Sequence, residues 1–128
     1  MPITLHYLDF EHSEDTEGVA TFEAMASVGP AQLAAQHAEI EEVLTWTYEA
    51  FADVRGPLDE GFEWDHDLQS QREFTASDEL RFDPTSGRLQ VQSGEPGLAR
   101  HTVTLSITGT ARFAEAFMAV FNQAIGLS

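Results

Sequence analysis

Residues 3 to 28 hold two segments with the aromatic, branched and alternating apolar positions that are typical of β-strands. Residues 3 to 10 are rich in aromatic and branched side chains, so we expect a strand there. Residues 11 to 18 form an acidic, turn-like connection that ends in glycine, and a second strand is expected from Val19 to about Val28. The two segments together predict an antiparallel hairpin.

From residue 31 the apolar positions recur every three or four residues, which predicts an amphipathic helix over residues 31 to 52. Gly29 and Pro30 end the preceding strand, and a proline suits the first turn of a helix. The stripe expected to face the core consists of Leu33, His37, Ile40, Leu44, Thr47, Tyr48 and Phe51. The side expected to face solvent carries Glu39, Glu42, Glu49 and Asp53.

After a loop, the second half of the chain returns to strand patterns. Residues 62 to 69 alternate between an aromatic and apolar face and an acidic outer face, which predicts a half-buried strand. Two short strands, residues 80 to 82 and 89 to 91, flank a turn that contains proline and glycine. Another strand is expected at residues 101 to 108, with its branched residues facing inward.

The closing segment predicts a second amphipathic helix, capped by Thr108 or Thr110 and ending near Gly126. In chain order the elements are two strands, a helix, four strands and a helix. Runs of adjacent strands favour an antiparallel sheet, and 128 residues with 42% hydrophobic content suit one domain. We therefore expect a single α+β domain over residues 1 to 128, with an antiparallel sheet of five or six strands and both helices on one face.

The charge of the chain is strongly acidic and unevenly placed. There are 22 Asp and Glu residues, six arginines and no lysine, for a formal net charge of −16. Residues 1 to 67 hold sixteen acids and one arginine, whereas residues 68 to 128 hold six acids and five arginines. Phosphate backbones and anionic membranes attract lysine and arginine, so we expect no direct binding to nucleic acids or membranes. A one-sided acidic field indicates a basic protein partner, and solvated charge without a partner is the alternative.

No motif in the chain predicts catalysis or a cofactor. The sequence has no cysteine, no Gly-x-Ser-x-Gly elbow, no His-Glu-x-x-His motif and no glycine-rich phosphate loop. Glu63, Asp65 and Asp67 lie on one face of a predicted strand and could offer oxygen ligands to a hard cation, but such a row is more typical of a solvated face. We expect a non-enzymatic protein without a catalytic residue, metal or cofactor.

Two features of the sequence bear on where the protein is found. No apolar run reaches the roughly 18 to 20 residues of a membrane span. The first residues lack the basic and apolar regions of a signal peptide. We therefore expect a cytoplasmic protein.

Trp46 is the most informative residue of the predicted helix. At about 100° per residue it lies about 150° from the centre of the apolar stripe, among Glu39, Glu42, Glu49 and Asp53. Tryptophan is enriched at binding hot spots, so Trp46 and the four acids form the predicted binding surface for a basic partner. The alternative is that another segment of the chain, or a second subunit in a homo-oligomer, covers the indole.

Three functions are compatible with these patterns. We favour a small binding or inhibitory protein that docks a basic protein through the acidic face of the helix over residues 31 to 52. The acids could instead imitate phosphate groups, so that the chain occupies the DNA- or RNA-binding site of another protein. The chain could also be a small ligand-binding domain or an enzyme, with a pocket between sheet and helices lined by His37, Tyr48, Trp64 and His66.

Overall fold

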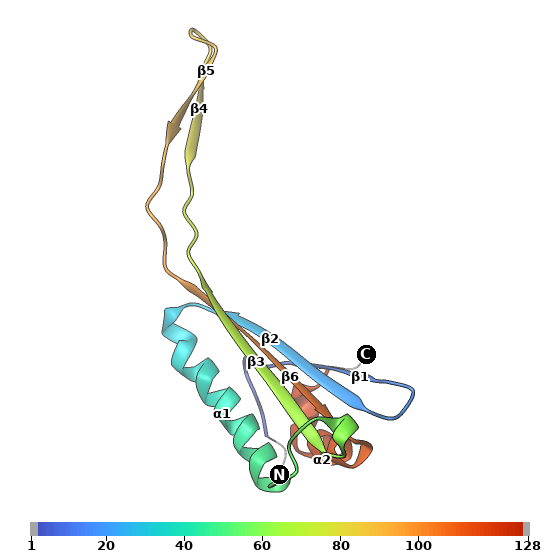
Figure 1. Ribbon diagram of the computed structural model, residues 1–128. Helices are drawn as coiled ribbons and strands as arrows, with labels where there is room; N and C mark the ends of the chain where they lie inside the picture. The colour runs from blue at the N-terminus through green and yellow to red at the C-terminus, as the bar shows by residue number, and fades with distance from the viewer. Residues whose placement is uncertain (1–2, 127–128) are drawn as a thin grey trace.

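The sheet at the centre of the molecule has four antiparallel strands. The structure, a computed structural model, describes residues 3 to 126. The sheet consists of β1 (Phe10–Glu14), β2 (Ala20–Val28), β6 (Arg100–Gly109) and β3 (Trp64–Glu73), in that spatial order (Figure 1). β6 pairs with β2 on one side and with β3 on the other, so that Leu105 lies opposite both Ala24 and Leu68.

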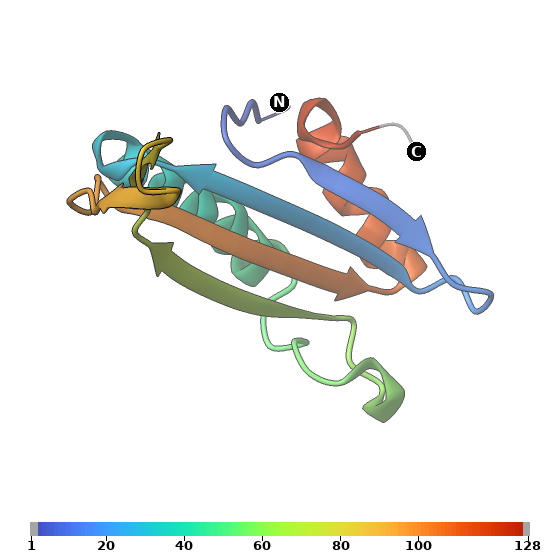
Figure 2. The same ribbon diagram turned by 90° about the horizontal axis from the view of Figure 1, so that it is seen from above.

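Two helices cover one face of this sheet and leave the other face open (Figure 2). They are α1 (Leu33–Ala50), which follows a 3-10 turn over Pro30–Gln32, and α2 (Ala111–Phe121), which ends in a 3-10 turn over Asn122–Ala124. The side-chain hydroxyl of Thr110 accepts a hydrogen bond of 3.3 Å from the backbone N–H of Phe113, which makes Thr110 the cap of α2. The predicted α+β fold, with its element order and both helices on one face, is confirmed.

The hydrophobic core lies between the sheet and the helices. Alternate residues of β2 from Ala20 to Val28 are buried, as are alternate residues of β6 from Val103 to Ile107. Helix α2 contributes the fully buried rings of Phe113, Phe117 and Phe121. Burial of each large apolar side chain stabilises the fold by about 1.5–3 kcal/mol, so this layer fixes both helices on the sheet.

The segment before β1 does not form the expected strand. The prediction of a strand over residues 3 to 10 is wrong, because β1 begins only at Phe10. Residues 3 to 9 run between the two helices instead. The N–H of Ile3 donates to the carbonyl of Val120 at 2.8 Å, and the carboxylate of Glu39 accepts three successive backbone N–H groups. The helices thus accept hydrogen bonds from backbone N–H groups that, in a strand, would bond to a neighbouring strand.

The other predicted elements form, with shifted ends. α1 is two residues shorter at each end than the predicted range of 31 to 52. β3 begins at Trp64 and continues to Glu73, because its whole length pairs with β6 and Glu73 lies opposite Arg100.

Two of the expected strands leave the main sheet. β4 (Glu79–Asp83) and β5 (Arg88–Gln92) pair only with each other and project from the rest of the molecule (Figure 1). We call residues 74 to 99 the arm and the rest of the described chain the body. The hairpin itself is confirmed, and its position outside the main sheet is a finding of the structure.

Candidate functional site

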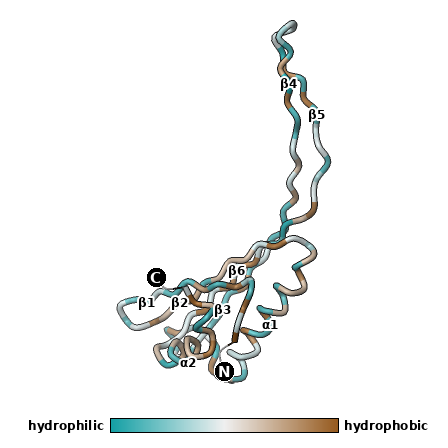
Figure 3. Tube along the Cα trace, turned by 180° about the vertical axis from the view of Figure 1, so that it is seen from behind, coloured by the Kyte–Doolittle hydropathy of each residue, from teal (hydrophilic) through white to brown (hydrophobic). Residues whose placement is uncertain are grey.

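One face of the hairpin β4–β5 is apolar and open to solvent. Leu80 lies opposite Val91 and Phe82 lies opposite Leu89, so the four side chains share one face of the ribbon. Their exposed fractions are 60%, 64%, 63% and 59% in that order. Figure 3 shows hydrophobic stretches of the chain at β4 and β5, far from the body. Together the four side chains present roughly 400 Å² of apolar surface, a size that marks interaction sites on soluble proteins.

The opposite face of the hairpin is polar and electrically balanced. Glu79, Arg81, Asp83 and Arg88 lie on it, and Gln90 pairs with Arg81. The Nε atom of Arg81 is 3.4 Å from a carboxylate oxygen of Glu79. One polar and one apolar face is the pattern of an antiparallel sheet that is covered on one side.

The turn that joins β4 to β5 is held by Asp83. One carboxylate oxygen accepts a hydrogen bond of 2.9 Å from the N–H of Thr85, and the other accepts one of 3.1 Å from the hydroxyl of Ser86. These bonds, the one from Thr85 first, lower the pKa of the Asp83 carboxyl below its ordinary value. Gly87 adopts a φ of +72°, which glycine tolerates without strain. The turn therefore sets the geometry of the apolar face.

Polar contacts, rather than a core, hold together the two segments of the arm that lead from the body to the hairpin. The N–H of Gly97 donates to the carbonyl of Thr75 at 2.8 Å, and the N–H of Gly94 donates to a carboxylate oxygen of Asp78 at 3.2 Å. A Cβ atom at Gly94 would collide with the carbonyl of Ser77, so the close approach of the two segments requires glycine. The two segments run side by side to the tip.

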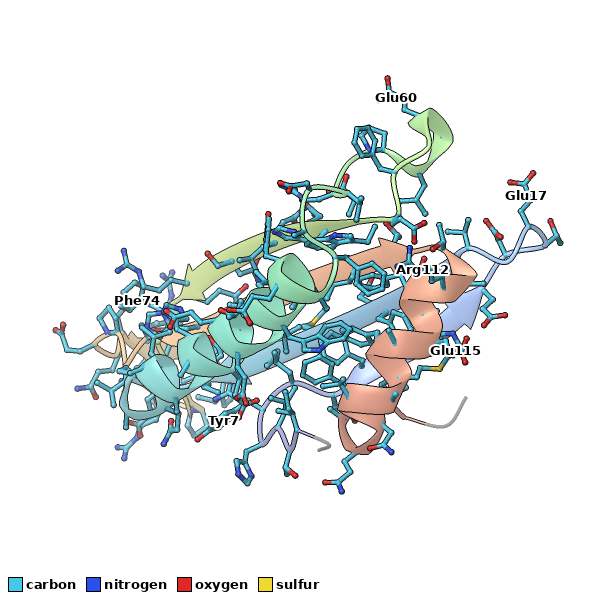
Figure 4. All side chains as sticks on the ribbon, turned by 90° about the horizontal axis from the view of Figure 1, so that it is seen from below. Tyr7, Glu17, Glu60, Phe74, Arg112 and Glu115 are labelled. Carbon is cyan, nitrogen blue, oxygen red and sulfur yellow. The ribbon has the colours of Figure 1, made fainter. Side chains whose placement is uncertain are left out.

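Two more apolar side chains are exposed near the base of the arm. Phe74 is 59% exposed and Leu98 is 85% exposed, and Figure 4 shows Phe74 at the end of the main sheet. The guanidinium carbon of Arg72 lies 5.5 Å from the centre of the Phe74 ring. A two-stranded hairpin without a core is only marginally stable in water. The arm therefore has the pattern of a segment that another surface completes.

A groove of about 370 Å³ lies between α1 and β3 on the body. Ile40 and Val103 line it but are buried, whereas Leu68 is 44% exposed. His37 and Glu41 line its α1 side. The groove offers a small apolar area next to a carboxylate.

A larger hollow of about 550 Å³ follows β1 and β2, and most of the residues that line it are polar. Its lining includes Asp9, Glu11, His12 and Glu23. Within residues 3 to 126, however, no group of three or more His, Cys, Asp or Glu residues could hold a metal ion.

The structure places only part of the predicted binding surface of α1 in solvent, because the buried side of the helix lies about a quarter of a turn from the expected stripe. Its buried residues are Gln36, Glu39, Ile40, Val43 and Thr47. Trp46 is half-buried, and its ring lies edge-on to three phenylalanines of α2, with centres 5.5 to 6.2 Å apart. The prediction that the indole faces solvent is wrong, and the alternative that another segment covers it is confirmed.

Glu39, also predicted on the solvent side, is only 8% exposed. One carboxylate oxygen accepts a hydrogen bond of 2.8 Å from the N–H of His6. The other accepts bonds of 2.9 and 3.1 Å from the N–H groups of Tyr7 and Leu8. The predicted solvent-facing position of Glu39 is therefore wrong, because this carboxylate fastens the N-terminal segment to α1.

Three of the predicted acids do lie at the surface. Glu42 and Glu49 are exposed on α1, and Asp53 is exposed in the turn that follows. Asp53 has a φ of +63°, which aspartate adopts more readily than most side chains. These acids form an exposed edge that lacks the predicted aromatic anchor.

Three of the four residues of the predicted ligand pocket lie together. The ring of Tyr48 is 5.0 Å from Trp64 and 5.9 Å from His66, and the last two rings stack at 5.8 Å. Trp64 is fully buried, and its indole N–H donates to the carbonyl of Phe51 at 3.1 Å. It is therefore part of the core. His37, the fourth residue, is exposed and lines the groove instead.

The surroundings of His66 displace the pKa of its imidazole. Burial lowers its pKa from the ordinary 6.5, and the charge of Arg55 lowers it further, while Asp65 and Asp67 act in the opposite direction. Its Nδ1 atom is buried without a hydrogen-bond partner in the described part of the chain. Arg55 is held by a 2.8 Å bond to Asp65. The imidazole thus lies at the edge of the core as a neutral group near pH 7.

The arm and the body differ strongly in net charge. The arm holds four acids and two arginines, a net charge of −2, whereas the remaining sequence holds eighteen acids and four arginines, a net charge of −14. The hairpin from Glu79 to Gln92, with two acids and two arginines, is neutral. Glu17 and Glu60 extend from loops at the edge of the body (Figure 4). The molecule thus consists of a strongly acidic body and an arm whose hairpin is neutral and has one apolar face.

Sequence reasoning predicted the hairpin but missed its apolar face as a site. The signal is present in the alternation of Leu80 with Phe82 and of Leu89 with Val91. It is also present in the polar, glycine-containing segments on both sides of the hairpin, which contribute few side chains to a core.

In residues 3 to 126, no helix has both the length and the apolar composition needed to cross a membrane. Comparison of the chain with protein-family models, curated proteins and solved structures found no match.

Proposed function

We propose that this chain is a non-enzymatic protein-docking module that binds another protein through the apolar face of its arm. The observation that carries the proposal is the set of four side chains on one face of the hairpin, each about three-fifths exposed. Large apolar residues gathered in this way are a feature of interaction sites rather than of ordinary surface. The pre-organised turn limits the conformational entropy that docking removes.

The positions of the residues predicted to line a ligand pocket favour a docking module over a small enzyme. Trp64 is a fully buried core residue, and His66 packs against it with a lowered pKa. His37 lies in the groove rather than with them. These side chains do not converge on a common open cavity, which is the arrangement that catalysis on a small substrate requires.

A photo-crosslinking amino acid in the arm tests the proposal. Benzoylphenylalanine at Phe82 keeps an aromatic ring on the apolar face, and the same group at Gln90 is the matched control on the polar face. In host extract, we expect irradiation to give a discrete protein adduct from position 82 and little from position 90. Adducts that are the same from both positions, or no adduct from either, would contradict docking through the apolar face.

The acidic body favours a second candidate function, the binding of a basic protein. The supporting observation is the exposed edge of Glu42, Glu49 and Asp53 on a body with a net charge of −14. The triple variant Glu42→Gln, Glu49→Gln and Asp53→Asn should then lose a basic protein that the wild type retains from extract at moderate salt.

The matched control for this test removes the same charge elsewhere on the body, with Glu17→Gln, Glu23→Gln and Glu115→Gln. It should retain the basic protein. Equal loss in both triple variants would indicate a general charge effect and would argue against a dedicated acidic interface.

A further inference from the structure

We propose that the protein docked by the arm is a second copy of this chain, whose arm packs its own apolar face against the first in a two-fold symmetric contact. This inference rests on the proposed function of the arm and names its partner. A two-fold contact uses the same patch on both subunits, so the patch must be complementary to itself. The apolar face of the hairpin meets this condition, because it presents the same two side-by-side pairs to either copy, Leu80 with Val91 and Phe82 with Leu89.

The contact supplies the second layer that the hairpin lacks. Two sheets packed face to face lie about 10 Å apart and interdigitate their inner side chains. Two stacked hairpins would form a four-stranded sandwich with eight apolar side chains inside and the charged faces outside. Each hairpin then becomes part of a structure with three or more strands and a shared core, which is what independent stability in water requires.

The charge distribution favours contact through the arms over contact through the bodies. Two bodies of net charge −14 repel each other, whereas the hairpin from Glu79 to Gln92 is neutral. The arm runs from residue 74 to the turn at Pro84 and Thr85, so at about 3.3 Å per residue it is on the order of 35 Å long. Copies joined near the tips hold their bodies apart by several screening lengths of about 8 to 10 Å.

The area of the contact is sufficient for a weak to moderate dimer. The four side chains of each copy bring together roughly 800 Å² over both partners. This is the size of weak or transient interfaces, which bury less than about 1,200 Å². We therefore expect a dimer that dissociates on dilution.

The groove between α1 and β3 of a second copy is the competing site on this chain for the arm. Its apolar lining is mostly covered, since Ile40 is 7% and Val103 is 3% exposed, and only Leu68 offers much free surface. Docking there would bury less apolar area than a second arm provides. It would also be head-to-tail, and such contacts form rings or open chains rather than closed pairs.

Sedimentation equilibrium of the purified chain tests the inference, with Phe82→Ser as the test variant and Gln90→Ser as its control on the opposite face. We expect the wild type and Gln90→Ser to form dimers of twice 14.1 kDa. In Phe82→Ser the dissociation constant should rise by at least about 30-fold, the effect of losing one hot-spot side chain. Because Phe82 is outside the core of the body, the far-ultraviolet circular dichroism spectrum of Phe82→Ser should differ little from that of the wild type.

The natural absence of cysteine allows a second, independent readout. A short bismaleimide that spans about 10 Å, the spacing of packed sheets, should link Val91→Cys chains into covalent dimers and should link Gln90→Cys chains much less. A dimer that persists in Phe82→Ser, or a chain that stays monomeric at all concentrations, would overturn the inference. Rings or open chains larger than a dimer would instead indicate arms docked head-to-tail on the bodies of other copies and would also overturn it.

The two proposals can fail separately. If the purified chain is monomeric but benzoylphenylalanine at position 82 crosslinks a foreign protein in extract, self-association is refuted and the docking function stands. If position 82 yields neither self-adducts nor foreign adducts, both proposals are refuted.

Discussion

Replacement of Glu39 by alanine should strongly destabilise the fold, although sequence patterning places this residue on the solvent side of its helix. Its carboxylate accepts backbone hydrogen bonds of 2.8, 2.9 and 3.1 Å from residues 6 to 8, and the donor of Leu8 is buried. Hydrogen bonds to a charged group contribute about 1.5–3 kcal/mol each, and part of this is recovered where water can reach the freed N–H groups. We therefore expect a loss of about 3–5 kcal/mol in the free energy of unfolding.

Urea unfolding followed by circular dichroism measures this loss, with Glu42→Ala as the matched control. Glu42 is exposed on the same helix, so its replacement should change the stability little. Glu39→Gln should be intermediate, because the amide keeps one acceptor oxygen but brings two hydrogens toward the same donors. Amide exchange should accelerate at residues 6 to 8 in Glu39→Ala. A stability loss as small as that of Glu42→Ala would refute the assigned role.

Three other changes test the packing of the body. Trp46→Ala should lower the free energy of unfolding, measured in urea, by about 3 kcal/mol and should leave association through the arm unchanged. Lost association with unchanged stability would contradict the packing of Trp46 on α2. Gly109→Ala would place a Cβ atom against the ring of Phe113 and should lower the midpoint of urea unfolding, by about 1–3 kcal/mol in free energy; an unchanged midpoint would argue against this contact. Because the pKa of His66 is lowered in the folded state, the unfolded state takes up protons first, so stability should fall as the pH drops below about 6.5. Unfolding curves from pH 7.5 to 5 measure how the free energy of unfolding changes with pH. This dependence should be weaker in His66→Asn and unchanged in His37→Asn. The same dependence in both variants would contradict the lowered pKa of His66.

The chain illustrates which parts of a helix its pattern can predict. The period of three and four correctly indicates a helix near residues 31 to 52, but two neighbouring stripes share Ile40 and Thr47, and the pattern does not decide between them. Contacts with distant segments of the chain determine how α1 is rotated about its own axis. Glu39 binds the N-terminal segment, and Trp46 packs on α2. Neither contact has a signature in local periodicity.

The hairpin illustrates a second limit of prediction. Alternating residues and the proline- and glycine-containing turn locate β4 and β5 to within a residue or two. Whether a strand joins the main sheet depends on the length and composition of its connections. Here residues 74 to 78 and 93 to 99 are mostly polar or small and form the stalk of the arm. The apolar face of the hairpin, whose sequence pattern is that of a buried face, is therefore exposed in the single chain.

Hydrogen–deuterium exchange of β4 and β5 as a function of protein concentration tests most directly whether another protein surface covers the apolar face of the arm. A hairpin covered in a dimer should be protected when concentrated and should lose protection on dilution, because an uncovered two-stranded sheet is only marginally stable. In Phe82→Ser the hairpin should exchange rapidly at every concentration, while the body stays protected. Protection that is equal in wild type and variant, and independent of concentration, would contradict the account.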